Sequence, residues 1–270
     1  MLRLKVGLIG CGTIGSSLAQ ILSREFPKVA QLRYLCDHHP EKAAALQRSL
    51  KVKTSIASSL DLIRQSDLII EAASASISGD VALQSLKQGK QVLIMSVGGL
   101  VDENIHRRLG KIQKGKLWIP SGAIAGVDGL LASSTGELKR VRLVTRKPPQ
   151  GLQSAPYFKT HPFPKLKNSQ EVRVFCGKAS EAVKAFPQNI NVAAVLSLAG
   201  LGPHRTEVEI WTSLRYKINQ HEVFIESDSG KIQAVAMNLP AKENPKTSQL
   251  AIRSAHALLR KVFSNIRIGT

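Results

Sequence analysis

The sequence predicts an α/β protein, in which a doubly wound parallel sheet is followed by a second domain of the α+β class. Two observations predict the first part: short apolar runs alternate with amphipathic segments, and a glycine-rich turn follows the first apolar run. A change of pattern after about Pro120 predicts the second domain. Alternating strands and helices are typical of a parallel sheet with right-handed crossovers.

The first part of the chain contains short apolar runs that are typical of strands buried on both faces. The expected strands are Leu4–Ile9, Leu32–Cys36, Leu68–Glu71, Val92–Ser96 and Leu117–Ile119. The segments between them have helical spacing, and the expected helices are Ile14–Arg24, Pro40–Leu50, Ser58–Arg64, Ser78–Lys87 and Val101–Ile112. Pro40 fits the first turn of a helix, where the missing N–H of proline costs no hydrogen bond.

The second part begins after a stretch of small residues, 121–126, which indicates a junction. The expected strands are Leu138–Arg146, Glu171–Cys176, Thr206–Ile218, His221–Glu226 and Lys231–Asn238, with helices over Ala179–Phe186 and Val192–Leu198. The turn Asp228-Ser229-Gly230 joins the last two strands, so we expect an antiparallel sheet. Residues 148–169 contain five prolines and predict an exposed loop. A last helix is expected from Lys246 or Thr247 to about Ser264.

The glycine-rich turn is the G-x-G-x-x-G sequence Gly10-Cys11-Gly12-Thr13-Ile14-Gly15. It follows a strand and opens a helix, which is the context that a dinucleotide-binding (Rossmann) motif requires. In this motif, the glycines allow a tight turn, a close approach of the backbone to a pyrophosphate, and close packing of helix on strand. The amino end of the helix offers unpaired N–H groups to the phosphates. A glycine turn without a ligand is the alternative.

Asp37 ends the second expected strand, 22 positions after Gly15. An acidic residue at this place accepts hydrogen bonds from the ribose hydroxyls. Because a carboxylate repels a 2′-phosphate, we expect NAD to be preferred over NADP. Asp37 could also serve as a helix N-cap, and the two roles do not exclude each other.

These features divide the chain into three parts. We expect a dinucleotide-binding domain over residues 1–122 and an α+β substrate domain over residues 123–242. Residues 243–270 then form a C-terminal helix that packs back on the first domain.

The composition indicates which partners, metal sites and cellular compartment to expect. The chain has 38 Lys and Arg against 19 Asp and Glu, a formal net charge of +19, but the basic residues are scattered and only 4% of residues are aromatic. We therefore expect a solvated basic surface, without a nucleic-acid or membrane partner. Cys11, Cys36 and Cys176 have no metal-ligand spacing, so no metal site is expected. Their small number fits reduced thiols in the cytoplasm, and we read no signal peptide.

Several stretches in the second half resemble the L-aspartate dehydrogenase family. They occur in the family's order between residues 121 and 248, and the runs around Asn191 and Pro245 are long and specific. These stretches are Ser121-Gly122-Ala123-Ile124, Thr145-Arg146-Lys147, residues 177–182, residues 186–194, Asn219-Gln220-His221-Glu222-Val223 and residues 243–248. The Ala125-Gly126 pair, the proline-rich insert and the high charge depart from the family's pattern.

The resemblance implies an NAD(P)-dependent oxidation of L-aspartate to iminoaspartate. This product either hydrolyses to oxaloacetate and ammonia or feeds NAD biosynthesis. The family's catalytic histidine falls on His221, and its nicotinamide-side contacts fall on Ala123 and Asn191. It also implies a small-molecule substrate, L-aspartate, and we expect a homodimer.

The residues themselves suit this chemistry. Histidine has an unperturbed pKa near 6.5 and can exchange protons at neutral pH. His221 lies where one expected strand ends and the next begins, so we place it at a sheet edge facing a cleft. Lys246, Thr247 and Ser248 at a helix start could hold a carboxylate, as could Arg146. Alternatively, Lys246, Thr247 and Ser248 only cap the helix, and Arg146 anchors a surface loop.

Other dehydrogenases and one class of non-enzyme are alternatives to this family. A phosphorylating semialdehyde dehydrogenase needs a nucleophilic cysteine near the junction, and residues 120–126 contain none. A dihydrodipicolinate reductase would carry an H-H-x-x-K run, whereas His38-His39-Pro40-Glu41-Lys42 differs. A homoserine dehydrogenase and a nucleotide-sensing regulator that binds nucleic acid remain as alternatives.

Overall fold

The computed structural model describes residues 3–167, 170–187, 191–242 and 244–270. The chain forms two compact units. The first unit comprises Met1–Pro120 and Ile252–Ile266, and the second comprises Ser121–Ala251 and Arg267–Thr270. Each unit is described by itself.

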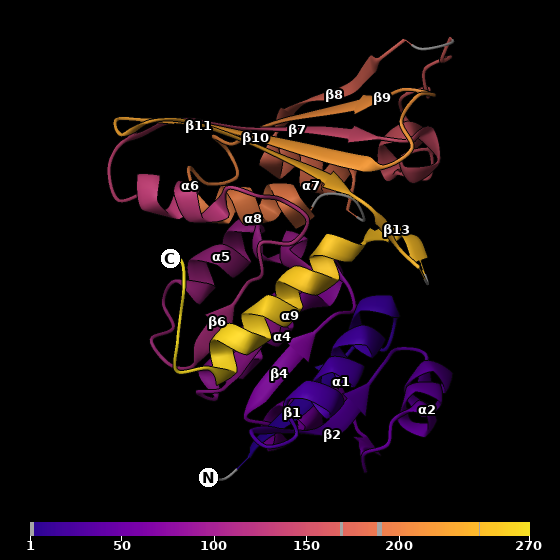
Figure 1. Cartoon of the computed structure of the whole chain (residues 1–270), viewed down its shortest axis with the longest axis vertical. Helices are drawn as coiled ribbons and strands as arrows, with labels where there is room; N and C mark the ends of the chain where they lie inside the picture. The colour runs from indigo at the N-terminus through magenta and orange to yellow at the C-terminus, as the bar shows by residue number, and fades with distance from the viewer. Residues whose placement is uncertain (1–2, 168–169, 188–190, 243) are drawn as a thin grey trace. The chain divides into compact units, whose positions relative to one another are not determined.

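The first unit contains a six-stranded parallel sheet in the order β3-β2-β1-β4-β5-β6 (Figure 1). Its strands are β1 (Leu4–Ile9), β2 (Ala30–Cys36), β3 (Ser55–Ile56), β4 (Leu68–Glu71), β5 (Gln91–Ile94) and β6 (Lys116–Trp118). The order reverses between β1 and β4, which both pair with their neighbours in parallel. In such a sheet, ligands bind at the carboxyl ends of the strands where the order reverses. The expected doubly wound parallel sheet is therefore confirmed.

Helices cover this sheet. They are α1 (Thr13–Glu25), α2 (Pro40–Ser49), α3 (Ser59–Gln65), α4 (Ala75–Lys87), α5 (Glu103–Leu109), the 3₁₀ turn η1 (Val97–Leu100) and most of α9 (Gln249–Phe263). The helix expected near Val101–Ile112 is present but shorter: Asp102 accepts hydrogen bonds from the N–H groups of Asn104 and Ile105 and so caps the start of α5.

Helix α9 returns to the first unit from the end of the chain. Its apolar residues Ala255 and Leu259 belong to the same buried cluster as Leu18 and Leu22 of α1. At the rim of this contact, the Glu25 carboxylate lies 2.8 Å from His256 Nε2 and accepts a hydrogen bond from Arg260. The apolar face fixes α9, and the Glu25–Arg260 ion pair adds little because both of its side chains are exposed.

The second unit contains a five-stranded sheet in the order β11-β10-β7-β9-β8. Its strands are β7 (Leu138–Lys147), β8 (Val172–Lys178), β9 (Glu207–Thr212), β10 (Asn219–Ser227) and β11 (Gly230–Asn238). Helices α6 (Val127–Ser133), α7 (Ala179–Ala185) and α8 (Asn191–Ala199) lie on one side of it (Figure 1). We call that side the inner face and the opposite side the outer face.

The expectation of a purely antiparallel sheet is wrong, because β7 and β9 run parallel. The chain leaves β7, forms β8, α7 and α8, and then returns to place β9 between β7 and β8. This long connection allows the parallel pairing that a hairpin cannot provide. The α+β class of the second domain is confirmed.

The proline-rich insert also differs from the expected exposed loop. It contains the 3₁₀ turns η2 (Pro149–Gly151) and η3 (Pro156–Lys159). Tyr157 and Phe158 of η3 pack against Phe186, whose side chain is fully buried. An aromatic cluster thus anchors the insert to the second unit.

The last helix begins later than expected. Residues Asn244–Ser248 form the strand β13, which pairs with β12 (Pro240–Ala241), and α9 starts at Gln249. Lys246 and Thr247 therefore lie in β13 and not at a helix start. No helix among the described residues is long and apolar enough to cross a membrane.

Candidate active site

The glycine-rich turn has the geometry that a dinucleotide requires. Gly10 has φ of +96°, and a Cβ there would lie 2.5 Å from the backbone of Ala72. A Cβ on Gly15 would collide with the carbonyl oxygen of Gly10, so the start of α1 can lie close to β1 only with glycine at this position. A Cβ on Gly12 would meet no described atom within 4 Å, so this side of the turn is open to an approaching ligand.

Helix α1 begins at Thr13, directly after the open glycine. Thr13 and Ile14 are the first residues of its amino-terminal turn, where N–H groups have no partner within the helix. The residues at this turn therefore fit a pyrophosphate, which accepts hydrogen bonds from such groups and is attracted by the helix dipole.

Asp37 lies directly after β2 and faces this turn. Its Oδ2 accepts a hydrogen bond of 2.6 Å from the N–H of Cys11, and its Oδ1 accepts one of 2.8 Å from the N–H of His39. The carboxylate therefore positions the glycine-rich turn and also the segment that leads into α2. Burial and the charge of Asp37 raise the pKa of the Cys11 thiol to about 12, so this cysteine stays protonated.

Glu71 is a buried carboxylate that sequence reasoning missed. It ends β4 and accepts backbone hydrogen bonds from Ala73, Ser74 and Ser96, at 2.7, 3.0 and 3.0 Å. Burial raises its pKa, and the three N–H donors oppose that shift. Glu71 thus ties together the loops that follow β4 and β5 at the carboxyl edge of the sheet. An acidic residue ending an apolar strand was the signal that could have identified it.

In the second unit, His221 lies on the inner face of β10. It is 3% exposed, and it pairs with Thr145 of β7 and Ala236 of β11. Its Nδ1 lies 3.0 Å from the hydroxyl of Thr145. The expectation that His221 lies at a sheet edge is wrong, because β10 is flanked by strands on both sides.

Lys147 lies on the same inner face as His221, at the end of β7. Alternation along the strand places Val141, Leu143, Thr145 and Lys147 on this face, and all four are buried. Burial lowers the pKa of Lys147 to about 8. Burial, followed by the nearby charge of Lys147, lowers the pKa of His221 to about 3. The imidazole is therefore neutral at physiological pH, and its acid–base range lies below the usual value near 6.5.

Asn238 connects two of the residues expected at the site. Its Nδ2 donates a hydrogen bond of 2.9 Å to the carbonyl oxygen of Ala123, and its Oδ1 accepts one of 3.1 Å from Ser248. Ser248 also accepts a hydrogen bond from the N–H of Leu250 and so begins α9. Asn238 ends β11, and nothing in its sequence context distinguishes it from a turn residue.

The other expected residues have different positions. Asn191 is the first residue of α8 and is half-buried. Lys246 and Thr247 lie in β13, and the Lys246 side chain is outside the described part of the structure.

Arg146 lies on the outer face, opposite to His221. Its guanidinium donates a hydrogen bond of 2.9 Å to Glu222 of β10, and this partner keeps its pKa above the usual value despite burial. The structure does not bring Arg146 together with His221, because neighbouring residues of a strand point to opposite faces.

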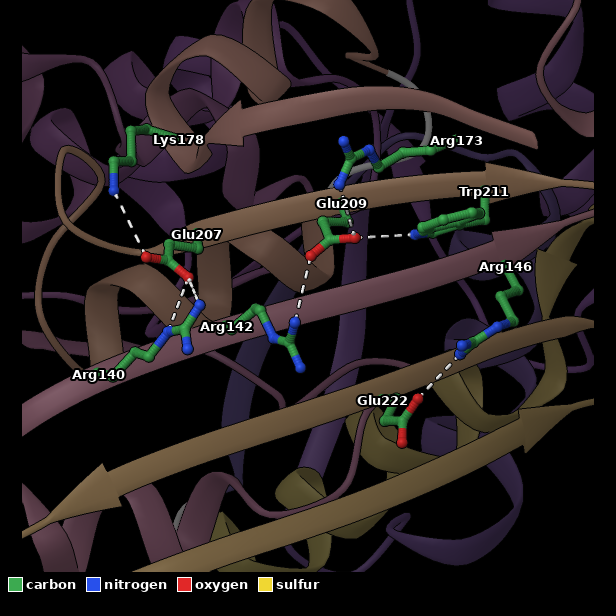
Figure 2. A network of polar contacts seen from close by, with 9 residues as sticks. All are labelled: Arg140, Arg142, Arg146, Arg173, Lys178, Glu207, Glu209, Trp211 and Glu222. Carbon is green, nitrogen blue, oxygen red and sulfur yellow. Dashed lines mark hydrogen bonds and ion pairs between the residues drawn. The ribbon is translucent and has the colours of Figure 1, made fainter. Parts of the chain in front are cut away.

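Arginine and glutamate side chains form a network along the outer face (Figure 2). Its ion pairs are Arg140–Glu207, Arg142–Glu209, Arg146–Glu222, Arg173–Glu209 and Lys178–Glu207. All acidic side chains of β9 and β10 therefore belong to the outer face, including Glu226, which pairs with Lys231. Among the described residues, no three His, Cys, Asp or Glu side chains are grouped to hold a metal ion.

Family models match both halves of the chain. Residues 128–262 match the model described as "Aspartate dehydrogenase, C-terminal", and residues 10–116 match "Homoserine dehydrogenase, NAD binding domain". The first part of the chain is therefore an NAD(P)-binding domain.

Full-length relatives agree with these matches. The chain is 44% identical to an L-aspartate dehydrogenase of Methanosarcina acetivorans, over 99% of this chain and 100% of the relative. It is 38% identical to an L-aspartate dehydrogenase of Nitrosopumilus maritimus, over 98% of this chain and 99% of the relative. The crystal structure of aspartate dehydrogenase from Thermotoga maritima superposes with a TM-score of 0.74 at 26% identity, covering 99% of this chain and 100% of that one.

Proposed function

The chain belongs to the L-aspartate dehydrogenase family, and from that premise we propose that His221 is its acid–base residue and that NAD is its preferred cofactor. As a member of this family, the protein is an L-aspartate dehydrogenase. The observation that carries the proposal is the buried His221–Thr145 pair on the inner face of the second unit. The semialdehyde dehydrogenase, homoserine dehydrogenase and reductase alternatives are set aside by the family assignment.

The cofactor assignment rests on the turn after β1. We assign Gly10, Gly12, Thr13, Ile14 and Gly15 to the pyrophosphate and Asp37 to the adenosine ribose. Support comes from the open side of Gly12 and from a carboxylate held beside the turn by the Cys11 N–H. A 2′-phosphate near that carboxylate would meet like charge, which favours NAD over NADP. Ala123 and Asn191 are assigned to the nicotinamide side by the family resemblance.

The proposed reaction begins with loss of the α-hydrogen and of one proton from the substrate nitrogen, which leaves iminoaspartate. The bound nicotinamide supplies the acceptor for the hydrogen and its electron pair. Water then adds to the imine carbon, and loss of ammonia gives oxaloacetate. Release of iminoaspartate before this step would instead supply NAD biosynthesis.

His221 moves the protons in this scheme. We assign its Nδ1–H as the donor to Thr145, which leaves the lone pair of Nε2 to accept a proton from the attacking water. The same lone pair can accept the proton that leaves the substrate ammonium. A neutral imidazole is required for either role, and burial among apolar residues keeps it neutral.

We further propose a homodimer formed through the outer face. The edge strand β11 exposes Val235 and Met237, at 47% and 67%, and Val235 pairs in register with Glu222 of the arginine–glutamate network. In a two-fold dimer the same surface of each subunit faces its copy, and a surface with apolar side chains and both signs of charge suits such a contact. Light scattering measures the mass of the protein in solution and decides between monomer and dimer.

We also propose that the protein is cytoplasmic. Cys11, Cys36 and Cys176 are free thiols, which supports this setting.

Absorbance at 340 nm tests the activity, with L-aspartate, L-glutamate and L-alanine each supplied with NAD or NADP. We expect L-aspartate with NAD to give the highest kcat/KM. A kcat/KM for L-alanine comparable to that for L-aspartate would show that the protein does not recognise the side-chain carboxylate of L-aspartate. A gel shift with duplex DNA at moderate salt tests the remaining alternative, a nucleic-acid-binding regulator, and we expect no shift.

A further inference from the structure

Glu71 is a buried carboxylate of the first unit that takes no part in the proposed proton transfers. It ends β4, the strand next to β1, and it is 0% exposed. Its Oε1 accepts hydrogen bonds from the N–H groups of Ala73 and Ser74, and its Oε2 accepts one from the N–H of Ser96. An ionised carboxylate offers only acceptors, so this one side chain can serve three donors on two loops.

The two loops border the expected position of the cofactor. The loop after β4 lies against the glycine-rich turn, because a Cβ on Gly10 would lie 2.5 Å from the backbone of Ala72. A dinucleotide binds across the carboxyl edge of such a sheet, at the point where the strand order reverses. With Asp37 assigned to the adenosine half on the β2 side of β1, the nicotinamide half falls over the carboxyl ends of β4 and β5.

The loop after β5 is held at both backbone polar groups of Ser96. The N–H of Ser96 donates to Glu71, and its carbonyl oxygen accepts a hydrogen bond of 2.7 Å from the Ser78 hydroxyl of α4. The turn η1 then packs closely on α4, since a Cβ on Gly99 would collide with the carbonyl oxygen of Ala75. Glu71, Ser78 and Ser96 are all buried. Two buried side chains therefore fix the position of this loop.

We propose that Glu71 is a positioning residue for the nicotinamide half of the cofactor and acts through the loops after β4 and β5. This inference rests on the cofactor site of the proposed function and deepens it. Glu71 acts through the backbone and not by contact with the cofactor, because both of its oxygens already accept hydrogen bonds from the loops. A loop that is held in place before binding loses less conformational entropy when the cofactor arrives.

Glu71→Gln tests this role with little change in side-chain shape. The amide replaces one acceptor oxygen with a donor, so at least one of the three buried N–H groups loses its partner. We expect the Kd of NAD to rise about tenfold, as it does when the binding-competent loop falls to about a tenth of the population. ADP carries the adenosine and the diphosphate but no nicotinamide, so its affinity should be unchanged. Calorimetry measures both dissociation constants.

Two further variants separate positioning from stability. Ser78→Ala removes the hydrogen bond to the carbonyl oxygen of Ser96 and should weaken NAD, but not ADP, by a smaller factor than Glu71→Gln does. Ser85→Ala is the matched control. Ser85 is buried on the same helix and donates to the carbonyl oxygen of Val81, so its loss should lower the melting temperature and leave both affinities unchanged.

Unchanged NAD affinity in Glu71→Gln, or equal losses of NAD and ADP, would overturn the inference. If Glu71→Gln does not fold, an unchanged ratio of the two dissociation constants in Ser78→Ala overturns it instead. The wild-type affinities are measured first. A wild-type protein that binds neither NAD nor ADP would contradict the proposed cofactor site itself, whereas normal wild-type binding with unaffected variants contradicts only the role of Glu71.

Discussion

The Thr145 hydroxyl and His221 Nδ1 lie 3.0 Å apart on the adjacent strands β7 and β10, in direct register on the inner face of the second unit. The hydrogen bond between them fixes the orientation of the imidazole and selects which ring nitrogen is free. In the proposed mechanism, proton transfer depends on both the orientation and the tautomer of the His221 ring.

Removing the Thr145 hydroxyl should release the His221 ring. We expect Thr145→Val, which keeps the side-chain shape, to lower kcat by about tenfold to 100-fold, the usual cost of misplacing a catalytic group. NAD affinity should be unchanged, because the glycine-rich turn lies in the other unit. Steady-state kinetics measure the first quantity and fluorescence titration the second. A normal kcat would show that Thr145 does not position the ring.

Removing the imidazole itself should cost more. We expect His221→Ala to lower kcat by about 10²–10⁴-fold, the contribution of a positioned acid–base group. NAD binding should change little. Normal NAD affinity with near-normal turnover would rule out His221 as the base, and the melting temperature of the variant serves as the control for folding.

The pH dependence of kcat/KM should follow the proposed base, His221, on its acid side. The acid limb of His221 should lie well below pH 6.5, since its pKa is about 3. An acid limb near 6.5 that vanishes in His221→Ala would contradict this assignment.

Acid should destabilise the fold through His221. The unfolded chain has the ordinary histidine pKa near 6.5, and the folded protein has a pKa of about 3. Between these values the unfolded chain binds more protons, so stability falls as pH falls from about 6.5 to about 3. The slope from this group is roughly 1.4 kcal/mol per pH unit. Urea unfolding across this window should show a shallower slope in His221→Ala; an unchanged slope argues against a buried neutral imidazole.

The choice of cofactor should depend on Asp37. We expect Asp37→Ala to weaken NAD more than NADP, because it removes both the ribose acceptor and the charge that opposes a 2′-phosphate. Both cofactors should lose some affinity, since Asp37 also holds the N–H of Cys11. The ratio of the two dissociation constants is therefore the measurement. Asp80→Ala, an exposed carboxylate of α4, is the control. Equal losses for both cofactors would exclude the ribose role.

Most of the first unit could be predicted from the sequence because its signals are local. The β1 range Leu4–Ile9 and the β4 range Leu68–Glu71 agree with the structure at both ends, since each is a short, mostly apolar segment. The turn from Gly10 to Gly15 is likewise specified by adjacent residues. The strand β3 was missed because Ser55 and Ile56 are too few to give a pattern.

The second unit was less predictable because its arrangement depends on distant pairing. The parallel β7–β9 contact joins residues separated by a long connection, and β13 forms only because Pro240–Ala241 pairs with it. The spacing of apolar residues within a segment does not show which distant strand the segment pairs with. The late start of α9 has the same cause.

The sequence by itself determined the Rossmann domain and the family, because the motifs of each consist of residues close together in the chain, and the family resemblance singled out His221 for the proposed role. Only the tertiary structure decided that His221 is buried beside Thr145, that Lys147 shares its face and that Arg146 does not. The period of two along a strand sends adjacent side chains to opposite faces, and the face that becomes buried is set by where α6, α7 and α8 pack.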